Sequence, residues 1–68
     1  MDKKMKAGQY LRKLIKENYS SQEEFAYDYG IDVRTVSRYV NKQGLDSIDL
    51  IQELAAFFQV DFFDFFKD

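Results

Sequence analysis

The chain has 68 residues, a formal net charge of -2, and neither cysteine nor histidine. This length fits one domain with a small core, and the missing residue types exclude disulfides, the usual zinc and transition-metal sites, and the commonest general base. No apolar run is long enough to span a membrane, so we expect one soluble, cytoplasmic domain over residues 1–68, without a metal, a cofactor, a small-molecule ligand or a catalytic residue.

The first predicted helix covers residues 5–18. Its inward positions are Leu11, Leu14, Ile15 and Asn18. These positions recur at spacings of three and four, which places them on one side of a helix. A second helix is predicted after Ser21, because Ser21 and Glu24 have the spacing of a capping box. It ends at Gly30, which tolerates a left-handed backbone, and its inner side is formed by Phe25, Ala26 and Tyr29.

The third predicted helix begins at Asp32, a good N-cap residue, and runs from Val33 to about Asn41. Its inward residues are Val36, Tyr39 and Val40. Residues 41–44 have the composition of a turn.

The fourth predicted helix begins near Asp46 or Ser47 and runs to Phe58. Its apolar positions are Ile48, Ile51, Leu54, Ala55 and Phe58. A last short helix begins at Asp61. The sequence therefore predicts an all-α fold of five short helices.

Residues 22–41 have the spacing of a helix-turn-helix unit, in which two short helices cross closely around a glycine turn. Ala26 is the small residue expected where the two helices meet, and Gly30 follows four residues later. Apolar residues then follow Gly30 at one, six and nine positions, namely Ile31, Val36 and Tyr39. Meeting all of these requirements together is a fairly specific indication of a helix-turn-helix unit.

The stretch "SQEEFAYDYGIDVRTVSRYVN" resembles the Cro/C1-type helix-turn-helix family, also called XRE or lambda-repressor-like, and "SIDLIQELAAFFQVDFFDFF" is similar to the end of that domain. The resemblance extends over residues 7–66 and implies a compact five-helix bundle. It also implies a sequence-specific regulator, a repressor that binds double-stranded DNA at a palindromic operator through the major groove as a homodimer.

The resemblance assigns roles to individual residues. Gln22 would grip a phosphate and brace the third helix. The side chains facing outward from that helix are Val33, Arg34, Thr35, Ser37 and Arg38. Arg34 is the best candidate for a bidentate contact with guanine. Asn41, Lys42 and Gln43 match the loop with which the family holds the DNA backbone.

Three departures from the family pattern bear on the structure. Asp32 stands where the family often has serine, so it brings a negative charge close to the phosphates. Ile15 stands where arginine is frequent, which removes an ion pair seen in relatives. Gln59 stands where glycine is usual, and we expect strain in that turn.

Charge is distributed unevenly along the chain. Residues 1–44 contain nine basic and six acidic residues, a net charge of +3, whereas residues 45–68 contain six acids and one lysine, a net charge of -5. This polarity can orient a protein on a polyanion even though its total charge is negative.

Six phenylalanines lie between residues 57 and 66. Periodicity predicts that Phe58, Phe62 and Phe65 face the core. The other three are Phe57, Phe63 and Phe66. These three either enlarge the core against the first helix or form an exposed apolar patch, which usually marks an interface. Such a patch would be the dimer interface or, as the alternative function, the binding surface of a protein-interaction module such as an antitoxin or an adaptor.

Overall fold

The computed structural model describes residues 3–41, 45 and 47–66, with residues 3–6 as backbone only. The helices are α1 (Lys3–Asn18), α2 (Gln22–Tyr29), α3 (Val33–Val40) and α4 (Ile48–Phe58), followed by the 3-10 helix η1 (Phe62–Phe66). These residues contain no strand, so the all-α fold class is confirmed. The count of five helices needs a small correction, because the last element is a single tight 3-10 turn, a form common in such short pieces.

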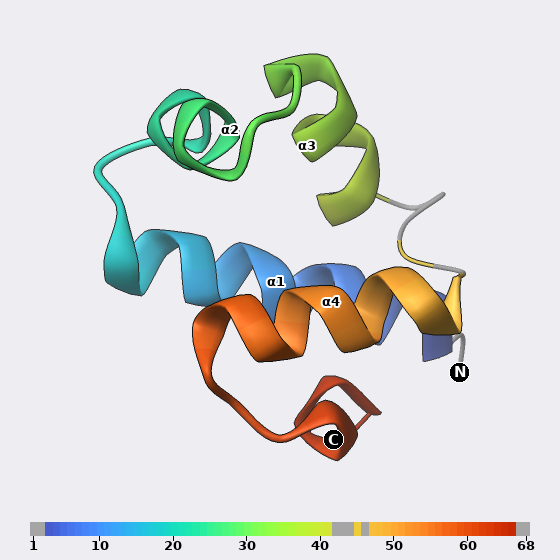
Figure 1. Ribbon diagram of the computed structural model, residues 1–68. Coiled ribbons are helices and arrows are strands. Elements are labelled where there is room, and N and C mark those ends of the chain that lie inside the picture. The colour runs from blue at the N-terminus through green and yellow to red at the C-terminus, as the bar shows by residue number, and fades with distance from the viewer. Residues whose placement is uncertain (1–2, 42–44, 46, 67–68) are drawn as a thin grey trace.

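The helices lie in three tiers (Figure 1). The first tier is formed by α2 and α3, the middle tier by α1 and α4, and η1 lies on the far side of the middle tier. Helix α3 packs on both α1 and α2, while η1 packs on both α1 and α4. The helix-turn-helix unit and η1 are therefore on opposite sides of the tier formed by α1 and α4.

The ends of α2 follow from local side-chain chemistry. Ser21 Oγ accepts a hydrogen bond from the backbone N–H of Glu24 at 3.1 Å, and the Glu24 carboxylate accepts one from the N–H of Ser20 at 3.0 Å. Gly30 closes the helix with φ of 90°, and its N–H donates to the carbonyl of Ala26 at 2.9 Å. The predicted Ser21 cap and the predicted glycine stop are both present, but Glu24 bonds the N–H of Ser20 where a capping box would use that of Ser21.

The ends of α3 and α4 are also defined by their own residues. Asp32 Oδ1 accepts from the N–H of Arg34 at 3.0 Å, which caps α3 as predicted. Ser47 Oγ caps α4 by accepting from the N–H of Leu50 at 3.3 Å, and the alternative start at Asp46 lies outside the described residues. At the other end of α4, Gln59 adopts the left-handed conformation expected of a glycine there, with φ of 59°.

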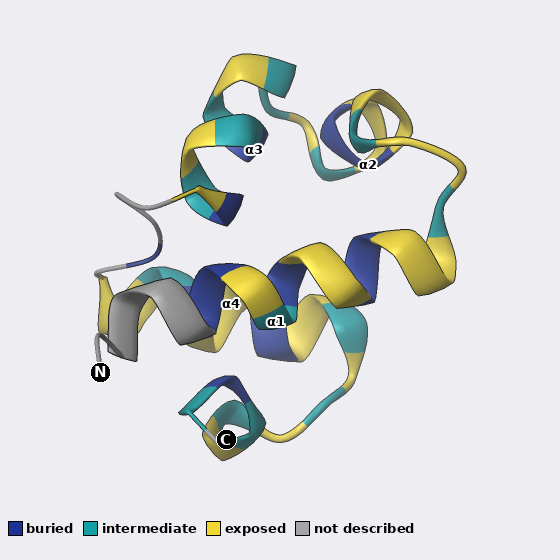
Figure 2. Cartoon of the chain, turned by 180° about the vertical axis from the view of Figure 1, so that it is seen from behind, coloured by how far each residue is buried: buried dark blue, intermediate teal, exposed yellow. Residues whose placement is uncertain are grey.

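The core is apolar throughout the part of the chain that the structure describes, with no buried polar or charged side chain. Its buried residues are Ala7, Leu11, Leu14, Ile15, Phe25, Ala26, Val36, Val40, Leu45, Ile51, Leu54, Ala55 and Phe65. In Figure 2 buried and exposed positions alternate along α1 and α4, as in helices with one inward side.

Two predicted inward positions are wrong, and both lie at helix ends that extend past the core. Asn18 is exposed at the end of α1, where its side-chain amide donates to the carbonyl of Leu14 at 2.8 Å. Ile48 is 54% exposed, because it is the first residue of α4. Periodicity places a residue on the correct side of a helix but does not say how far along the helix the core extends.

Candidate nucleic-acid interface

The turn between α2 and α3 is closed by one carbonyl. The backbone N–H groups of Gly30 and Ile31 both donate to the Ala26 oxygen, each at 2.9 Å. Ala26 itself is buried, and so are Phe25 on α2 and Val36 on α3. The two helices are thus fixed to each other by backbone hydrogen bonds and by a common apolar contact, which is the arrangement of a helix-turn-helix unit.

Helix α3 has an inner and an outer side. Val36 and Val40 are buried and Tyr39 is half-buried against the core. Arg34 and Arg38 are exposed, and their spacing of four residues puts them one turn apart on the same side of the helix. The two arginines are therefore available to a ligand that approaches α3 from outside.

The other residues predicted to face outward from α3 are less accessible. Thr35 and Ser37 are half-buried, and so is Val33, which packs against the core cluster. Val33 therefore helps to hold α3 in place and offers only part of its surface to a partner. Asp32, just before α3, is exposed, so its carboxylate is accessible at the N-terminal end of that helix.

The C-terminal end of α3 carries a further polar contact. The side-chain amide of Asn41 donates to Ser37 Oγ at 3.2 Å. This bond joins two of the predicted DNA-binding residues, because positions four apart are neighbours on a helix surface. The other two residues predicted for this loop, Lys42 and Gln43, lie outside the described residues.

Gln22 is the first residue of α2 and is half-buried. It lines a groove of about 170 Å³ together with Arg12 and Lys16 of α1. The backbone N–H groups at a helix N-terminus attract anions, and here two basic side chains lie beside them. The sequence pattern does not group Arg12 and Lys16 with Gln22, because their proximity depends on the angle between α1 and α2.

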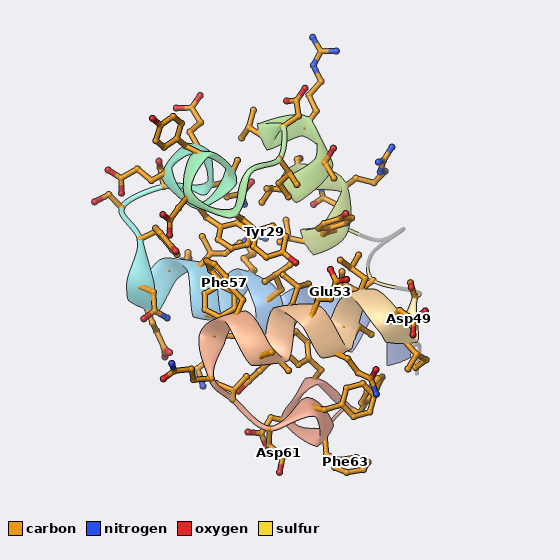
Figure 3. The ribbon with its side chains drawn as sticks, viewed as in Figure 1. Tyr29, Asp49, Glu53, Phe57, Asp61 and Phe63 are labelled. Atoms are coloured by element: carbon orange, nitrogen blue, oxygen red, sulfur yellow. The ribbon has the colours of Figure 1, made fainter. Side chains whose placement is uncertain are left out.

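The three phenylalanines predicted as interface residues have different surroundings. Phe57 is 39% exposed, and its ring packs edge-on against Tyr29 of α2, with the ring centroids 4.9 Å apart. Phe66 is half-buried against Phe62, with the ring centroids 5.2 Å apart. Phe63 is 68% exposed and points outward from η1, away from α4, whereas Phe57 points toward α2 (Figure 3). The structure does not bring Phe57 and Phe63 together.

The acids near the end of the described chain lie on α4 and at η1. Residues 47–66 contain no lysine or arginine, and their acids are Asp49, Glu53, Asp61 and Asp64. Asp49 and Glu53 lie on α4, and Asp61 precedes η1 beside Phe63 (Figure 3). The charges are therefore not divided by tier: α4 and η1 carry these acids, α1 beside α4 carries Arg12, Lys13 and Lys16, and α2 carries Glu23, Glu24 and Asp28.

Tyr29 connects α2 with this acidic helix. Burial raises the pKa of Tyr29, and the negative charge of Glu53 on α4 raises it further. The side chains of Tyr29, Glu53 and Phe57 lie next to one another in the space between α2 and α4 (Figure 3). This contact joins the helix-turn-helix unit to α4 through side chains.

Within residues 3–41, 45 and 47–66, no cluster of three or more potential ligand side chains could hold a metal ion. None of the helices in that part of the chain has the length and apolarity needed to cross a membrane.

The fold and this site define the class of helix-turn-helix DNA-binding proteins. A family model described as Helix-turn-helix matches residues 11–65. Because the match covers most of the chain, the chain belongs to the Cro/C1-type helix-turn-helix family, a family of DNA-binding transcription regulators. Searches of curated proteins and of solved structures found no match.

Proposed function

We propose that residues 1–68 form one DNA-binding domain that acts as a repressor, binding a palindromic operator as a homodimer. The observation that carries this proposal is the two-sided character of α3, which buries Val36 and Val40 and exposes Arg34 and Arg38. A helix held in this way can enter the major groove without losing its packing. Repression follows where the occupied operator overlaps a promoter.

The roles of the side chains follow from their places on the two helices. Arg34, at the start of α3, makes a bidentate contact with a guanine, and Arg38, one turn later, contacts a base edge or a phosphate. Gln22 at the start of α2 contacts a phosphate, with Arg12 and Lys16 supplying positive charge beside it. Thr35 and Val33 offer methyl groups to thymine with the part of each side chain that is exposed.

A homodimer is supported by the exposure of Phe63. An apolar ring that is 68% exposed is costly to leave in water and is buried when two copies meet. In a twofold dimer the two α3 helices would reach major grooves about 34 Å apart, one DNA turn, and would read the two halves of a palindrome. We propose Phe63 as the central contact.

A second candidate function is favoured by the acids around Phe63. Asp61 and Asp64 lie on either side of Phe63 in the sequence, and residues 47–66 contain no lysine or arginine. A protein partner with a basic and apolar surface would complement these charges, whereas a second copy would bring acids close to acids. In that case the chain is an adaptor or an antitoxin, and DNA binding is secondary.

The proposed function is tested by selecting bound sequences from a random DNA pool and then comparing two double variants. Arg34→Ala with Arg38→Ala should abolish operator binding while the helical circular dichroism stays unchanged. Arg34→Lys with Arg38→Lys keeps both charges but lacks the planar fork of arginine, so each lost base contact should weaken operator binding by about 1–3 kcal/mol. Binding of the lysine variant to random DNA should change little.

The results separate the two functions. A symmetric selected site, with affinity that falls steeply as salt rises, supports the dimeric DNA-binding function. If the alanine variant still protects the selected site from nuclease, α3 does not read DNA through these residues. The absence of any selected sequence, or weak salt dependence, favours the adaptor.

A further inference from the structure

Gly8 lies in α1 directly beneath the last turn of α3. A Cβ atom at this position would be 2.7 Å from the carbonyl oxygen of Tyr39, and 3.4 Å from both the carbonyl carbon and the Cα of Val40. All three atoms belong to the backbone of α3 or its end, so no flexible side chain can move aside. Any residue other than glycine forces α3 and α1 apart.

Glycine at position 8 lowers the stability of α1, and its backbone conformation does not require a glycine. Glycine in a helix interior is less favourable than alanine by about 0.5–1 kcal/mol. Gly8 is well inside α1, which covers Lys3–Asn18, and among the described glycines the positive φ belongs to Gly30. The close approach of α3 is therefore the physical reason for a glycine at position 8.

The α3 seat is the surface of α1 on which α3 packs, and Gly8 is part of it. The neighbouring inward residues of α1, Ala7 and Leu11, are completely buried, as is Val36 of α3. Helix α3 packs on α1 at this seat and on α2 through the Gly30 turn (Figure 1). A change in the seat is therefore transmitted to the helix-turn-helix unit that α3 forms with α2.

We propose that Gly8 is a positioning residue for DNA recognition, setting the depth and tilt at which α3 docks on α1. This inference rests on the proposed function of α3 in reading DNA. Eight residues of helix span about 12 Å, so lifting the end of α3 at Tyr39 tilts the whole helix and displaces Arg34 and Arg38. In a dimer the same movement changes the distance between the two recognition helices. Gly8 also lies outside the residues matched by the family model.

The experiment compares Gly8→Ala with Gln9→Ala, a control at the exposed neighbouring position of the same helix. Both variants are studied at a temperature at which circular dichroism shows them fully folded, with the selected operator and with random DNA of equal length. For Gly8→Ala we expect a lower melting temperature despite the better helix propensity of alanine. Its operator affinity should fall about tenfold or more, the scale of one lost base contact, while its affinity for random DNA falls less than about threefold. Gln9→Ala should behave like the wild type.

Each other result overturns the proposal. Equal losses on operator and random DNA would give Gly8 a purely structural role, and an unchanged operator affinity would show that α3 does not depend on this seat. Trimethylamine N-oxide is added if Gly8→Ala is unstable, since it favours the folded state, and a variant that stays unfolded shows that Gly8 serves the fold alone. If the wild type selects no DNA sequence, the proposed function itself fails, and this outcome is seen before any variant is made.

Discussion

The phenolic hydroxyl of Tyr19 donates a hydrogen bond to Oδ2 of Asp28 across 2.6 Å. Tyr19 directly follows α1, and Asp28 lies in the last turn of α2, so the bond ties the end of α1 to the helix-turn-helix unit. The ring of Tyr19 also packs edge-on against Phe25 and Phe58, with centroids 5.5 Å and 6.4 Å away. The polar and apolar parts of this side chain can therefore be tested separately.

Tyr19→Phe removes the hydroxyl and keeps the ring. We expect a loss of no more than about 1 kcal/mol in the free energy of unfolding at neutral pH, because the hydrogen bond is exposed and solvent screens it. Urea denaturation measures this value. Tyr27→Phe, at a fully exposed position of α2, is the control and should change nothing.

The same bond predicts an alkaline loss of stability. The hydrogen bond to Asp28, followed by burial and the charge of Asp28, raises the pKa of Tyr19 from 10.0 to about 12. The folded chain thus holds this proton more tightly than the unfolded chain does, so the contribution is complete below pH 10.0 and is lost as the pH rises toward about 12. Tyr19→Phe should reduce the fall in melting temperature across this window. An identical fall in both proteins would contradict the assignment to Tyr19.

Gln59 is strained in a way that a single substitution can relieve. It ends α4 with φ of 59°, a conformation that costs a non-glycine residue about 1–2 kcal/mol. Gln59→Gly removes this cost but adds freedom to the unfolded chain, so we expect a net gain of about 0.5 kcal/mol and a higher melting temperature. Gln52→Gly, at an exposed position inside α4, should instead lose about 1 kcal/mol. A loss of stability in both variants would show that Gln59 makes a compensating contact.

The parts of the fold that were predicted correctly depend on chemistry within a few residues. Ser21, Gly30 and Asp32 determine where helices begin and end by bonding to backbone groups two to four positions away, so the sequence alone locates them. The inner side of α3 follows in the same way, because Val36 and Val40 repeat at helical spacing.

The features that could not be predicted depend on how helices approach one another in space. The helical spacing of α4 does not place Phe57 among the inward residues, yet its ring packs against Tyr29 of α2. The proximity of Gln22 to Arg12 follows from the turn between α1 and α2. Gly8 lies inside one predicted helix, and its contact with the backbone of α3 depends on how the two helices pack. No periodicity within one helix contains this information.

Asp32 combines a stabilising cap with an unfavourable charge. Its carboxylate caps α3 at 3.0 Å from the N–H of Arg34, and it is exposed at the end of α3 that would meet DNA. Asp32→Asn keeps a good cap without the charge, so stability should change by less than about 0.5 kcal/mol while DNA affinity rises a few-fold at low salt. Asp32→Ala should lose about 1 kcal/mol of stability, since it removes the cap as well. Unchanged DNA affinity in Asp32→Asn would place this end of α3 away from the phosphates.

Substitution by alanine should affect different properties at Phe57 and at Phe63. Phe57 packs against Phe25 and Tyr29, with ring centroids 6.0 Å and 4.9 Å away, so Phe57→Ala should lower the free energy of unfolding by about 1–2 kcal/mol and leave the oligomeric state unchanged. Phe63 is largely exposed, so Phe63→Ala should alter monomer stability by less than about 0.5 kcal/mol.

The effect of Phe63→Ala should appear instead in self-association. Because Phe63 is the proposed central contact of the dimer, its removal should shift sedimentation from dimer to monomer and weaken operator binding more than binding to a single half-site. Asp61, beside Phe63, repels its symmetry mate in such a dimer, so wild-type dimerisation should tighten as salt rises, opposite in direction to DNA binding. A wild-type chain that sediments as a monomer at all salt concentrations would rule out the dimer and leave Phe63 to a basic protein partner.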